Sequence, residues 1–405
     1  MKSLNVAIAV PRFPNLVQTY ILNQLISLKS RGVNLNIIAS EKGEHDNLPN
    51  AINDNRLLDS VIYINVDSVS QILKNMIMLP VFNKEYRKAV KNILSYKSGG
   101  LNGRYFRLKS LLRARAATAG PYDIIHSHSM FSSFALMFLK QVLSVPLITT
   151  YHGRIPEGVK SLDKWKMKIV FEGSDAFLVN TEYAKKDLVK LGCPKSKIHI
   201  IPQGIDLENF EFHKRKIQPG KTIRLISVGR LSPEKGHNVA LRAINEIIMD
   251  CPDLEYHIIG HGPERERLER ICAELNLSDH VIFHGFKAGK ELNKLFALAH
   301  IFILPSKSET QGVVIQEAQA CGIPVIANNT GGIPEVIKEN ITGLLYKEND
   351  SMDLAHKIRA IIKDPILYQQ LCDYGYSDVK DRFDIDVVSQ RLINFYNSVI
   401  KNVNQ

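Results

Sequence analysis

The chain has 405 residues, which at roughly 150 residues per domain predicts two or three domains rather than one. Charged residues make up 23% and hydrophobic residues 45%, which excludes a disordered chain, a collagen and a coiled coil. No stretch approaches the roughly 20 continuous apolar residues of a membrane-spanning helix, and the first apolar run, 4–10, is too short for a secretory signal. The five cysteines are widely spaced without a C-x-x-C pair, so they predict neither a disulfide framework nor a zinc site. We therefore expect a cytoplasmic protein.

Positive charge is concentrated in the first half of the chain. Residues 1–205 hold 28 Lys and Arg against 14 Asp and Glu, whereas residues 206–405 hold 24 against 27. One half is strongly basic and the other mildly acidic, so we expect the two halves to meet different partners.

Short β-branched runs alternate with helical patterns along the first half, which is typical of a parallel α/β sheet. The expected strands are 5–10, 35–39, 122–126, 147–151 and 176–180, with a helix at 19–30.

The second half repeats this alternation, so the predicted fold class is α/β with two Rossmann-like domains, 1–205 and 206–405. Because ligands bind beyond the carboxyl ends of the strands in such sheets, we expect the site in a cleft between the domains. The expected strands are 224–228, 255–259, 281–283, 301–304, 324–327 and 343–345, and the expected helices are 236–249, 263–275, 313–321, 351–362 and 387–400.

A polar loop followed by a helix, residues 306–324, carries the most informative pattern. Gly312 would let the backbone approach a ligand, and the helix that follows would present free N–H groups to an anion. Glu309 lies in the loop and Glu317 about one turn into the helix. Taken singly, each residue would more often be an ordinary surface acid or an ordinary helical acid.

The spacing Glu309–x7–Glu317, with Glu-Ala-x-Ala-x-Gly-x-Pro after it, resembles the E-x7-E signature of glycosyltransferase family 4, which has the GT-B fold and retains anomeric configuration. Four further segments of the second half resemble the same family in the same order. They are 226–236, 258–263, 281–286 and 330–335.

The first half resembles this family less tightly. The run 13–20 is similar to the "F-P-x-x-S-E-T-F" opening of transferases that build exopolysaccharide or O-antigen units, with Val17 and Gln18 in place of Ser and Glu. The Gly-Gly loop common elsewhere in the family is absent. Segments 123–128, 150–153 and 201–206 resemble the family's H-x-H, T-x-H-G and "I-P-N-G-V-D" elements. The resemblance also implies a C-terminal helix that crosses back to the N-terminal domain.

The resemblance implies a donor site in the second domain, and the chemistry needs such residues. Cleavage of a sugar–diphosphate bond places negative charge on the leaving group, which Arg230 and Lys235 would meet. For Arg230 the alternative is a structural pair with a carboxylate. Glu317 would accept hydrogen bonds from ribose hydroxyls, and Glu309 would hold hydroxyls of the donor sugar.

Backbone groups would complete the donor site. The N–H groups at Gly312, Val313 and Val314 would bind phosphate or sugar oxygens. By resemblance, Gly229 belongs to the same site, and the backbone around the segment His284, Gly285 and Phe286 would hold the base.

In the first domain, the resemblance places His152 near the donor sugar and the reacting oxygen. A core or surface histidine is the alternative. His126 and His128 alternate on a strand, so only His128, nearer its end, is expected in the cleft. Gln18 and Thr19 are also assigned to the cleft, although the sequence leaves open whether their loop meets donor or acceptor.

No metal is predicted, because no carboxylate or thiolate accompanies the histidines at ligand spacing. The sequence Asp384-Ile-Asp386 spells a D-x-D motif but precedes a helical pattern, so we interpret it as a helix cap.

Residues 74–115 carry 11 Lys and Arg and one acid. Lys84, Arg87, Lys88 and Lys91 would share one helix face beside apolar residues, a pattern that favours an anionic membrane surface. A solvated face and a nucleic-acid site are the alternatives, although no nucleic-acid recognition motif accompanies the run.

Together these features predict a retaining, metal-independent glycosyltransferase without a cofactor. It would move a sugar from a UDP- or GDP-sugar to a saccharide acceptor, lipid-linked, in cell-surface polysaccharide biosynthesis at the inner face of the cell membrane. A sugar-nucleotide epimerase of the same fold and a non-catalytic, nucleotide-binding membrane scaffold are the alternatives.

Overall fold

The computed structural model describes residues 3–15, 19–43, 50–64, 120–153 and 164–403, with ten single or paired residues between 87 and 118. The chain forms two compact units. Unit 1 comprises Met1–Ile201 and Ser389–Gln405, and unit 2 comprises Pro202–Val388.

Unit 1 is built on a parallel sheet of seven strands in the order β3-β2-β1-β4-β5-β6-β7. From β1, near the middle of the sheet, β2 and β3 follow outward on one side. Strands β4 to β7 follow in order on the other side of β1. The strands are β1 (Asn5–Phe13), β2 (Asn34–Lys42), β3 (Val61–Tyr63), β4 (Ile124–Ser127), β5 (Leu147–Tyr151), β6 (Ala176–Val179) and β7 (Ile198–Ile200).

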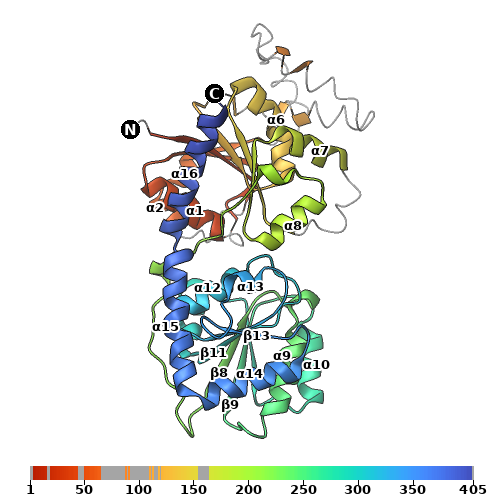
Figure 1. Ribbon diagram of the computed structural model, residues 1–405, viewed down its shortest axis with the longest axis vertical. Helices are drawn as coiled ribbons and strands as arrows, with labels where there is room; N and C mark the ends of the chain where they lie inside the picture. The colour runs from red at the N-terminus through yellow and green to blue at the C-terminus, as the bar shows by residue number, and fades with distance from the viewer. Residues whose placement is uncertain are drawn as a thin grey trace. The chain divides into compact units, whose positions relative to one another are not determined.

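Helices cover both faces of this sheet (Figure 1). One face packs against α6, α7 and α8, and the other against α1, α2 and the last helix, α16, whose Leu392 and Tyr396 are fully buried. The helices are α1 (Thr19–Ser30), α2 (Asn50–Asp54), α6 (Met130–Leu143), α7 (Lys164–Gly173), α8 (Glu182–Lys190) and α16 (Ile385–Val403).

Unit 2 contains a parallel sheet of six strands in the order β10-β9-β8-β11-β12-β13. The strands are β8 (Ile223–Val228), β9 (Leu254–Ile259), β10 (Val281–Gly285), β11 (Ile301–Leu304), β12 (Val325–Asn328) and β13 (Leu344–Tyr346). The helices are α9 (His237–Ile247), α10 (Arg265–Glu274), α11 (Gly289–Leu298), α12 (Val313–Ala320), α13 (Ile333–Val336), α14 (Ser351–Lys363) and α15 (Pro365–Arg382).

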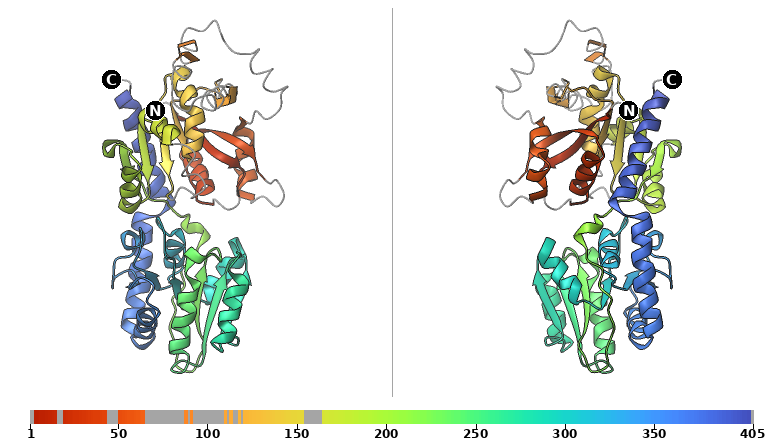
Figure 2. Two further views of the ribbon diagram at one scale, coloured as in Figure 1. Left: turned by 90° about the vertical axis from the view of Figure 1, so that its right-hand side faces the viewer. Right: turned by 90° about the vertical axis from the view of Figure 1, so that its left-hand side faces the viewer.

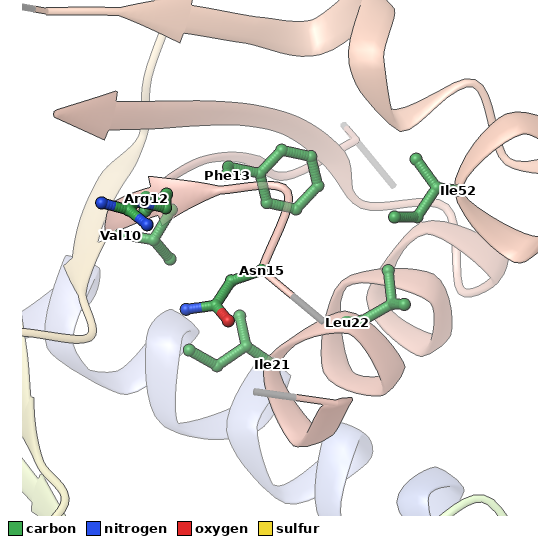
Figure 3. Close-up of a pocket in the computed structure, with 7 residues that line it drawn as sticks. All are labelled: Val10, Arg12, Phe13, Asn15, Ile21, Leu22 and Ile52. Carbon is green, nitrogen blue, oxygen red and sulfur yellow. The ribbon is translucent and has the colours of Figure 1, made fainter. Parts of the chain in front are cut away.

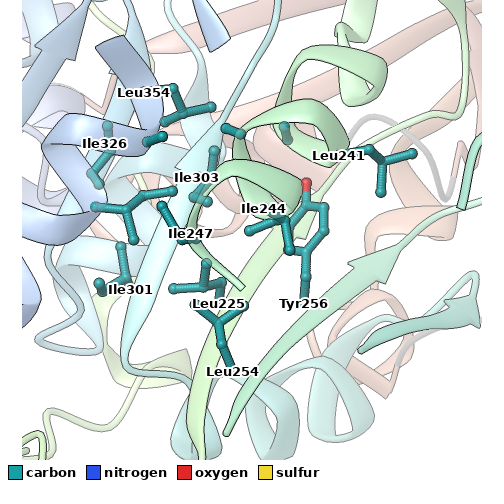
Figure 4. Close-up of a cluster of buried hydrophobic side chains, with 14 of the residues drawn as sticks. Leu225, Leu241, Ile244, Ile247, Leu254, Tyr256, Ile301, Ile303, Ile326 and Leu354 are labelled. Carbon is teal, nitrogen blue, oxygen red and sulfur yellow. The ribbon is translucent and has the colours of Figure 1, made fainter. Parts of the chain in front are cut away.

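Two apolar clusters hold unit 2 together, one on each face of its sheet. The helices that cover the sheet of this unit are seen in Figure 2. Between the sheet and helices α9 and α14, the buried side chains include Leu225, Ile244 and Tyr256 (Figure 4). The opposite cluster joins the sheet to α11, α12 and α13. Burial of these side chains on both faces explains why the strands are nearly continuous runs of apolar residues.

The predicted fold class is confirmed, since each unit is a Rossmann-like α/β layer structure. The last helix packs in unit 1, as the resemblance implied. Asp384 caps that helix by accepting a hydrogen bond from the Asp386 N–H at 2.9 Å, which confirms the interpretation of the D-x-D sequence. Several described elements have no counterpart among the predicted ranges, namely the strands β3 and β7 and the helices α2, α6, α7, α8, α11, α13 and α15.

Within the described residues, no helix combines the length and the apolar character needed to cross a membrane.

Candidate active site

The order of strands in unit 2 reverses between β8 and β11, which lie side by side at the centre of the sheet. In open α/β sheets, ligands bind at the carboxyl ends of the strands at such a reversal. The loop after β8 contains Gly229, Arg230 and Lys235, and the loop after β11 contains Glu309 and Gly312. The topology therefore gathers the sequence-predicted donor residues at the expected edge.

Lys235 and Glu309 form an ion pair between these two loops, through Nζ and Oε1. Ser306 adds a hydrogen bond from its hydroxyl to the same oxygen of Glu309 at 3.3 Å. The backbones are also joined, because the Lys307 N–H donates to the Glu234 carbonyl at 2.8 Å. Lys235, the predicted phosphate-binding cation, and Glu309, the predicted sugar-binding carboxylate, thus contact each other.

Arg230 differs from Lys235 in its surroundings. Its side chain is exposed, and no residue that the structure describes forms an ion pair with it. The structural pair considered as an alternative is therefore not present among these residues. Gly229 lies beside Lys235, and a Cβ at this position would meet Lys235 Cδ at an ordinary contact distance of 3.8 Å.

Helix α12 begins as the motif predicted. Gly312 adopts a left-handed backbone with φ of 74° and precedes Val313, the first residue of the helix. A glycine supplies no side chain to cap a helix, and the first N–H groups of any helix lack partners within it. The Ile315 N–H bonds to the Gly312 carbonyl at 2.9 Å, whereas none of the described residues accepts from the Val313 or Val314 N–H. These two groups are therefore suited to an anion.

Glu317 lies one turn into α12 and is the most perturbed carboxyl group of this region. Burial raises the pKa of Glu317 to about 7. No described residue donates a hydrogen bond to its carboxyl group or forms an ion pair with it. The side chain is partly exposed, so a ligand with hydroxyl groups could reach the carboxylate and satisfy it.

The Glu309 loop is held by contacts that sequence reasoning missed. Its carbonyl accepts a hydrogen bond from the Gly332 N–H at 2.9 Å, and any Cβ on Gly331 would lie 2.2 Å from the same oxygen. Buried Gln311 bonds to both backbone groups of Gln203, at 2.8 and 2.9 Å. The sequence showed that segments 330–335 and 201–206 resemble the family. It did not show that Gly332 of the first segment bonds to Glu309, or that Gln203 of the second bonds to Gln311.

The carboxyl-terminal ends of β9 and β10, with Phe286 after them, form a third part of this edge. His284 Nε2 lies 2.8 Å from Nδ1 of His257, and the two rings stack with an angle of 14°. Burial, followed by the nearby His257 and Lys287, lowers the pKa of His284. Gly285 has a positive φ of 69°, and Phe286 is 71% exposed. The exposed ring of Phe286 is compatible with a base-binding role.

In unit 1, the structure brings His128 and His152 together. Both follow directly after neighbouring parallel strands, β4 and β5, and His128 Nδ1 lies 3.2 Å from His152 Nε2. Burial lowers the pKa of His152 to about 4, and burial with the nearby His126 and His152 lowers that of His128 well below its usual value. Both rings are therefore neutral at pH 7.

The expectation that His126 and His128 face opposite sides is wrong, because residues two apart in a strand share a face and the two ring centroids lie 4.4 Å apart. His126 is fully buried, with Nδ1 at 2.6 Å from the Tyr396 hydroxyl and Nε2 at 2.6 Å from the Thr150 hydroxyl. Burial, then the nearby His152, lowers its pKa to about 3. This histidine anchors α16 to the sheet.

The opening loop of unit 1 is described only in part. Gln18 lies outside the described residues, and Thr19 is the first residue of α1. A small pocket lies where β1 ends and this loop begins (Figure 3). Its lining is mostly apolar and consists of Val10, Arg12, Phe13, Asn15, Ile21, Leu22 and Ile52.

Most of the basic segment 74–115, including Lys84, lies outside the described residues. Arg87, Lys88 and Lys91 are helical and exposed, whereas Val90 packs against the core of unit 1. Val90, one of the apolar residues beside the basic face, is thus partly buried against that core.

Across the described ranges, no group of three or more His, Cys, Asp and Glu side chains is arranged to hold a metal ion. Independence from metal stays a prediction.

Two family profiles match the chain in succession. The profile of Glycosyltransferase Family 4 matches residues 17–209, and that of glycosyl transferases group 1 matches residues 208–378. The first corresponds to the region that carries the histidines and the second to the region that carries the E-x7-E motif.

Two bacterial relatives are similar over most of their length. WcaL of Escherichia coli, named for colanic acid biosynthesis, is 27% identical over 86% of this chain and 88% of its own. The amylovoran biosynthesis glycosyltransferase AmsK of Erwinia amylovora is 29% identical over 85% of this chain and 87% of its own.

A solved structure shows the same fold. Anabaena Alr3699/HepE, crystallised in complex with UDP, matches with a TM-score of 0.74 over 98% of this chain and all of that one, at 17% identity. The fold, the two profiles and the relatives agree with the resemblance found in the sequence. The chain belongs to glycosyltransferase family 4 and is a transferase enzyme of the GT-B fold.

Proposed function

We propose that the protein transfers a sugar, with retention of anomeric configuration, from a nucleotide-sugar to a lipid-linked saccharide in cell-surface polysaccharide biosynthesis. Unit 2 would bind the donor and unit 1 the acceptor. The observation that carries the proposal is the group formed by Arg230, Lys235, Glu309 and the start of α12 at the strand reversal of unit 2.

The chemistry of the donor matches this group. A diphosphate carries negative charge that increases as the glycosidic bond breaks, and fixed cations and backbone N–H groups stabilise that charge. Arg230 and Lys235 supply the cations, and Val313 and Val314 supply N–H groups. The Lys235–Glu309 pair would open when a diphosphate attracts Lys235, which would release Glu309 to bind sugar hydroxyls.

Polysaccharide synthesis is supported by the relatives. WcaL and AmsK are named for colanic acid and amylovoran, both made by sugar transfer. HepE has been crystallised with UDP and with UDP-glucose, which supports a uridine diphosphate sugar as the first donor to test. We also propose that the reaction requires neither a metal nor another cofactor.

The donor is identified first by thermal unfolding with a panel of UDP-, GDP- and ADP-sugars. A ligand at 100 times its dissociation constant stabilises the native state by about 2.7 kcal/mol, so one group of nucleotides should raise the melting temperature clearly. The stabilising donor is then incubated with polyprenyl diphosphate-linked saccharides, and the product's anomeric configuration is read by NMR. Inversion of configuration, or no transfer from any stabilising donor, would contradict the proposal.

The metal prediction is tested in the same assay. Turnover should survive an excess of EDTA. A loss of turnover in EDTA that added Mg²⁺ reverses would show that a metal takes part.

A further inference from the structure

The ring of His152 contacts two other rings. His128 stacks on it with an interplanar angle of 11° and a centroid distance of 5.4 Å, and Tyr20 of α1 lies 5.1 Å away at 59°. His128 is itself fixed, because its backbone N–H donates to the Ala9 carbonyl of β1 at 2.8 Å. The position of His152 therefore depends on residues from β1, β4 and α1.

The two histidines share one hydrogen bond between ring nitrogens. His128 Nδ1 and His152 Nε2 are 3.2 Å apart, so one of these atoms carries a hydrogen and the other accepts it. Both rings are neutral at pH 7, since burial lowers the pKa of each. A neutral imidazole has a single N–H, so the direction of this bond decides the tautomer of both residues.

The other ring nitrogen of His128, Nε2, decides which of the two histidines donates this hydrogen bond. This nitrogen is buried and has no hydrogen-bond partner in the described part of the chain, and the residue is only 7% exposed. If His152 donated, His128 would carry its hydrogen on this nitrogen and leave a buried N–H without an acceptor. Buried unpaired N–H groups are rarer than buried unpaired acceptors. The favoured arrangement therefore has His128 Nδ1–H donating to His152 Nε2.

We propose that His128 is a positioning residue that fixes the orientation and the tautomer of His152, which then carries its hydrogen on Nδ1. With Nε2 already accepting from His128, neither ring nitrogen of His152 is available to accept a proton. His152 therefore does not act as a general base in the reaction. The role of His152 in transfer rests on the proposed function, whereas the tautomer does not.

The tautomer can be measured directly in the full chain. Protein labelled with ¹⁵N-histidine is studied by long-range ¹H–¹⁵N NMR at pH 7, and the His152 signals are assigned by their absence in His152→Asn. We expect His152 with hydrogen on Nδ1 in the wild type. A wild-type His152 with hydrogen on Nε2 would overturn the proposal, with no need for any variant at position 128 to fold.

Variants at His128 test the cause. His128→Leu removes the donor, so His152 should shift toward the Nε2–H form and kcat should fall about ten- to a hundredfold, the range found when a residue that orients a metal-binding histidine is removed. His128→Asn keeps an N–H near the Nδ1 position and should restore both the tautomer and most of the turnover. His199→Leu, which removes another histidine of unit 1, is the matched control and should change neither.

The two ways of failing are distinguishable. If the wild type transfers no sugar but His152 has the expected tautomer, the proposed function is wrong and the positioning role of His128 stands. If the tautomer is unchanged in His128→Leu, or kcat falls equally in His128→Asn and His128→Leu, His128 does not position His152.

Discussion

The two cations after β8 look alike in the sequence but stand in different surroundings. Arg230 is exposed and has no ion-pair partner among the described residues, whereas Lys235 is paired with Glu309, whose side chain is only 15% exposed. A mutation at Arg230 should therefore affect chemistry alone. A mutation at Lys235 should affect chemistry and leave a largely buried carboxylate unpaired.

We predict that Arg230→Ala and Lys235→Met each lower turnover substantially, because the loss of one group that stabilises developing charge costs on the order of 3–4 kcal/mol. Only Lys235→Met should also lower the free energy of unfolding, by about 1–3 kcal/mol. Urea unfolding and initial rates measure the two effects. Adding Glu309→Gln to Lys235→Met should recover part of the stability, and equal stability of both single variants would refute the assignment.

Glu317 gives a prediction about pH. Its folded-state pKa of about 7 lies above the ordinary value of 4.5, so the unliganded protein gains stability from this group at low pH and loses it as pH rises through 7. Glu317→Gln removes this dependence. The difference in unfolding free energy between Glu317→Gln and wild type, measured from pH 5 to 8, should move in favour of the variant as pH rises. A difference that does not change with pH would contradict the raised pKa.

Nucleotide binding should show the opposite trend. Only the carboxylate form of Glu317 can accept hydrogen bonds from two ribose hydroxyls, so affinity for the nucleotide should fall as pH drops below 7. Isothermal titration at several pH values measures it. Glu309→Gln serves as the control and should keep this dependence while it loses turnover.

At the scale of elements, helix α12 is fixed at both ends. Gly312 sets its beginning, and buried Arg215 holds its end by donating to the Cys321 carbonyl. The same guanidinium bonds to the carbonyls of Phe296 at 2.9 Å and His213 at 3.2 Å, and it is 8% exposed. Arg215 thus ties α11 to α12, the helix that carries Glu317.

We predict that Arg215→Met lowers the free energy of unfolding by about 3 kcal/mol, since hydrogen bonds from a charged donor are among the stronger ones and the carbonyls would be left unpaired. It should also weaken nucleotide binding, because α12 loses its support. Denaturant unfolding and titration measure both. Arg242→Met replaces an exposed arginine on α9 and should change stability by no more than about 0.5 kcal/mol. Equal effects of the two variants would contradict the role of Arg215.

At the scale of the whole molecule, the uneven charge predicts where the protein works. The strongly basic first half would favour an anionic membrane surface, to which each cation near the lipid contributes about 1 kcal/mol. Because Val90 packs inward, attachment through the exposed Arg87, Lys88 and Lys91 would depend on charge more than on apolar insertion. Salt should therefore reverse it readily.

We predict that the protein co-sediments with vesicles containing anionic lipid at low salt, ignores neutral vesicles, and is released as salt rises, because the screening length is about 8 Å at physiological ionic strength. Replacing Lys84, Arg87, Lys88 and Lys91 by Glu should abolish sedimentation and leave donor binding unchanged. Equal sedimentation with both vesicle types, or none with either, would identify this segment as an ordinary solvated surface.

The sequence by itself determined the features that depend on neighbouring residues. Alternating apolar runs and helical patterns predicted most of the strands and the helices α1, α9, α10, α12, α14 and α16. Gly312 marked the start of α12 and Asp384 marked a cap, because a cap or a positive φ is decided within a few residues. The spacing of Glu309 and Glu317 carried the resemblance to the family. The short strands β3 and β7 were not predicted, because each has only three residues and is stabilised by pairing with a longer neighbouring strand.

Only the tertiary structure decided which distant groups meet. Helix α15 was missed because Gly375 and Asp378 occupy buried positions on it, and Asp378 is satisfied by Lys338, 40 residues away. The contacts between Lys235 and Glu309 and between His128 and His152 follow from which strands lie side by side. Strand order is set by packing of the whole sheet and its helices, and no local pattern in the chain encodes that order.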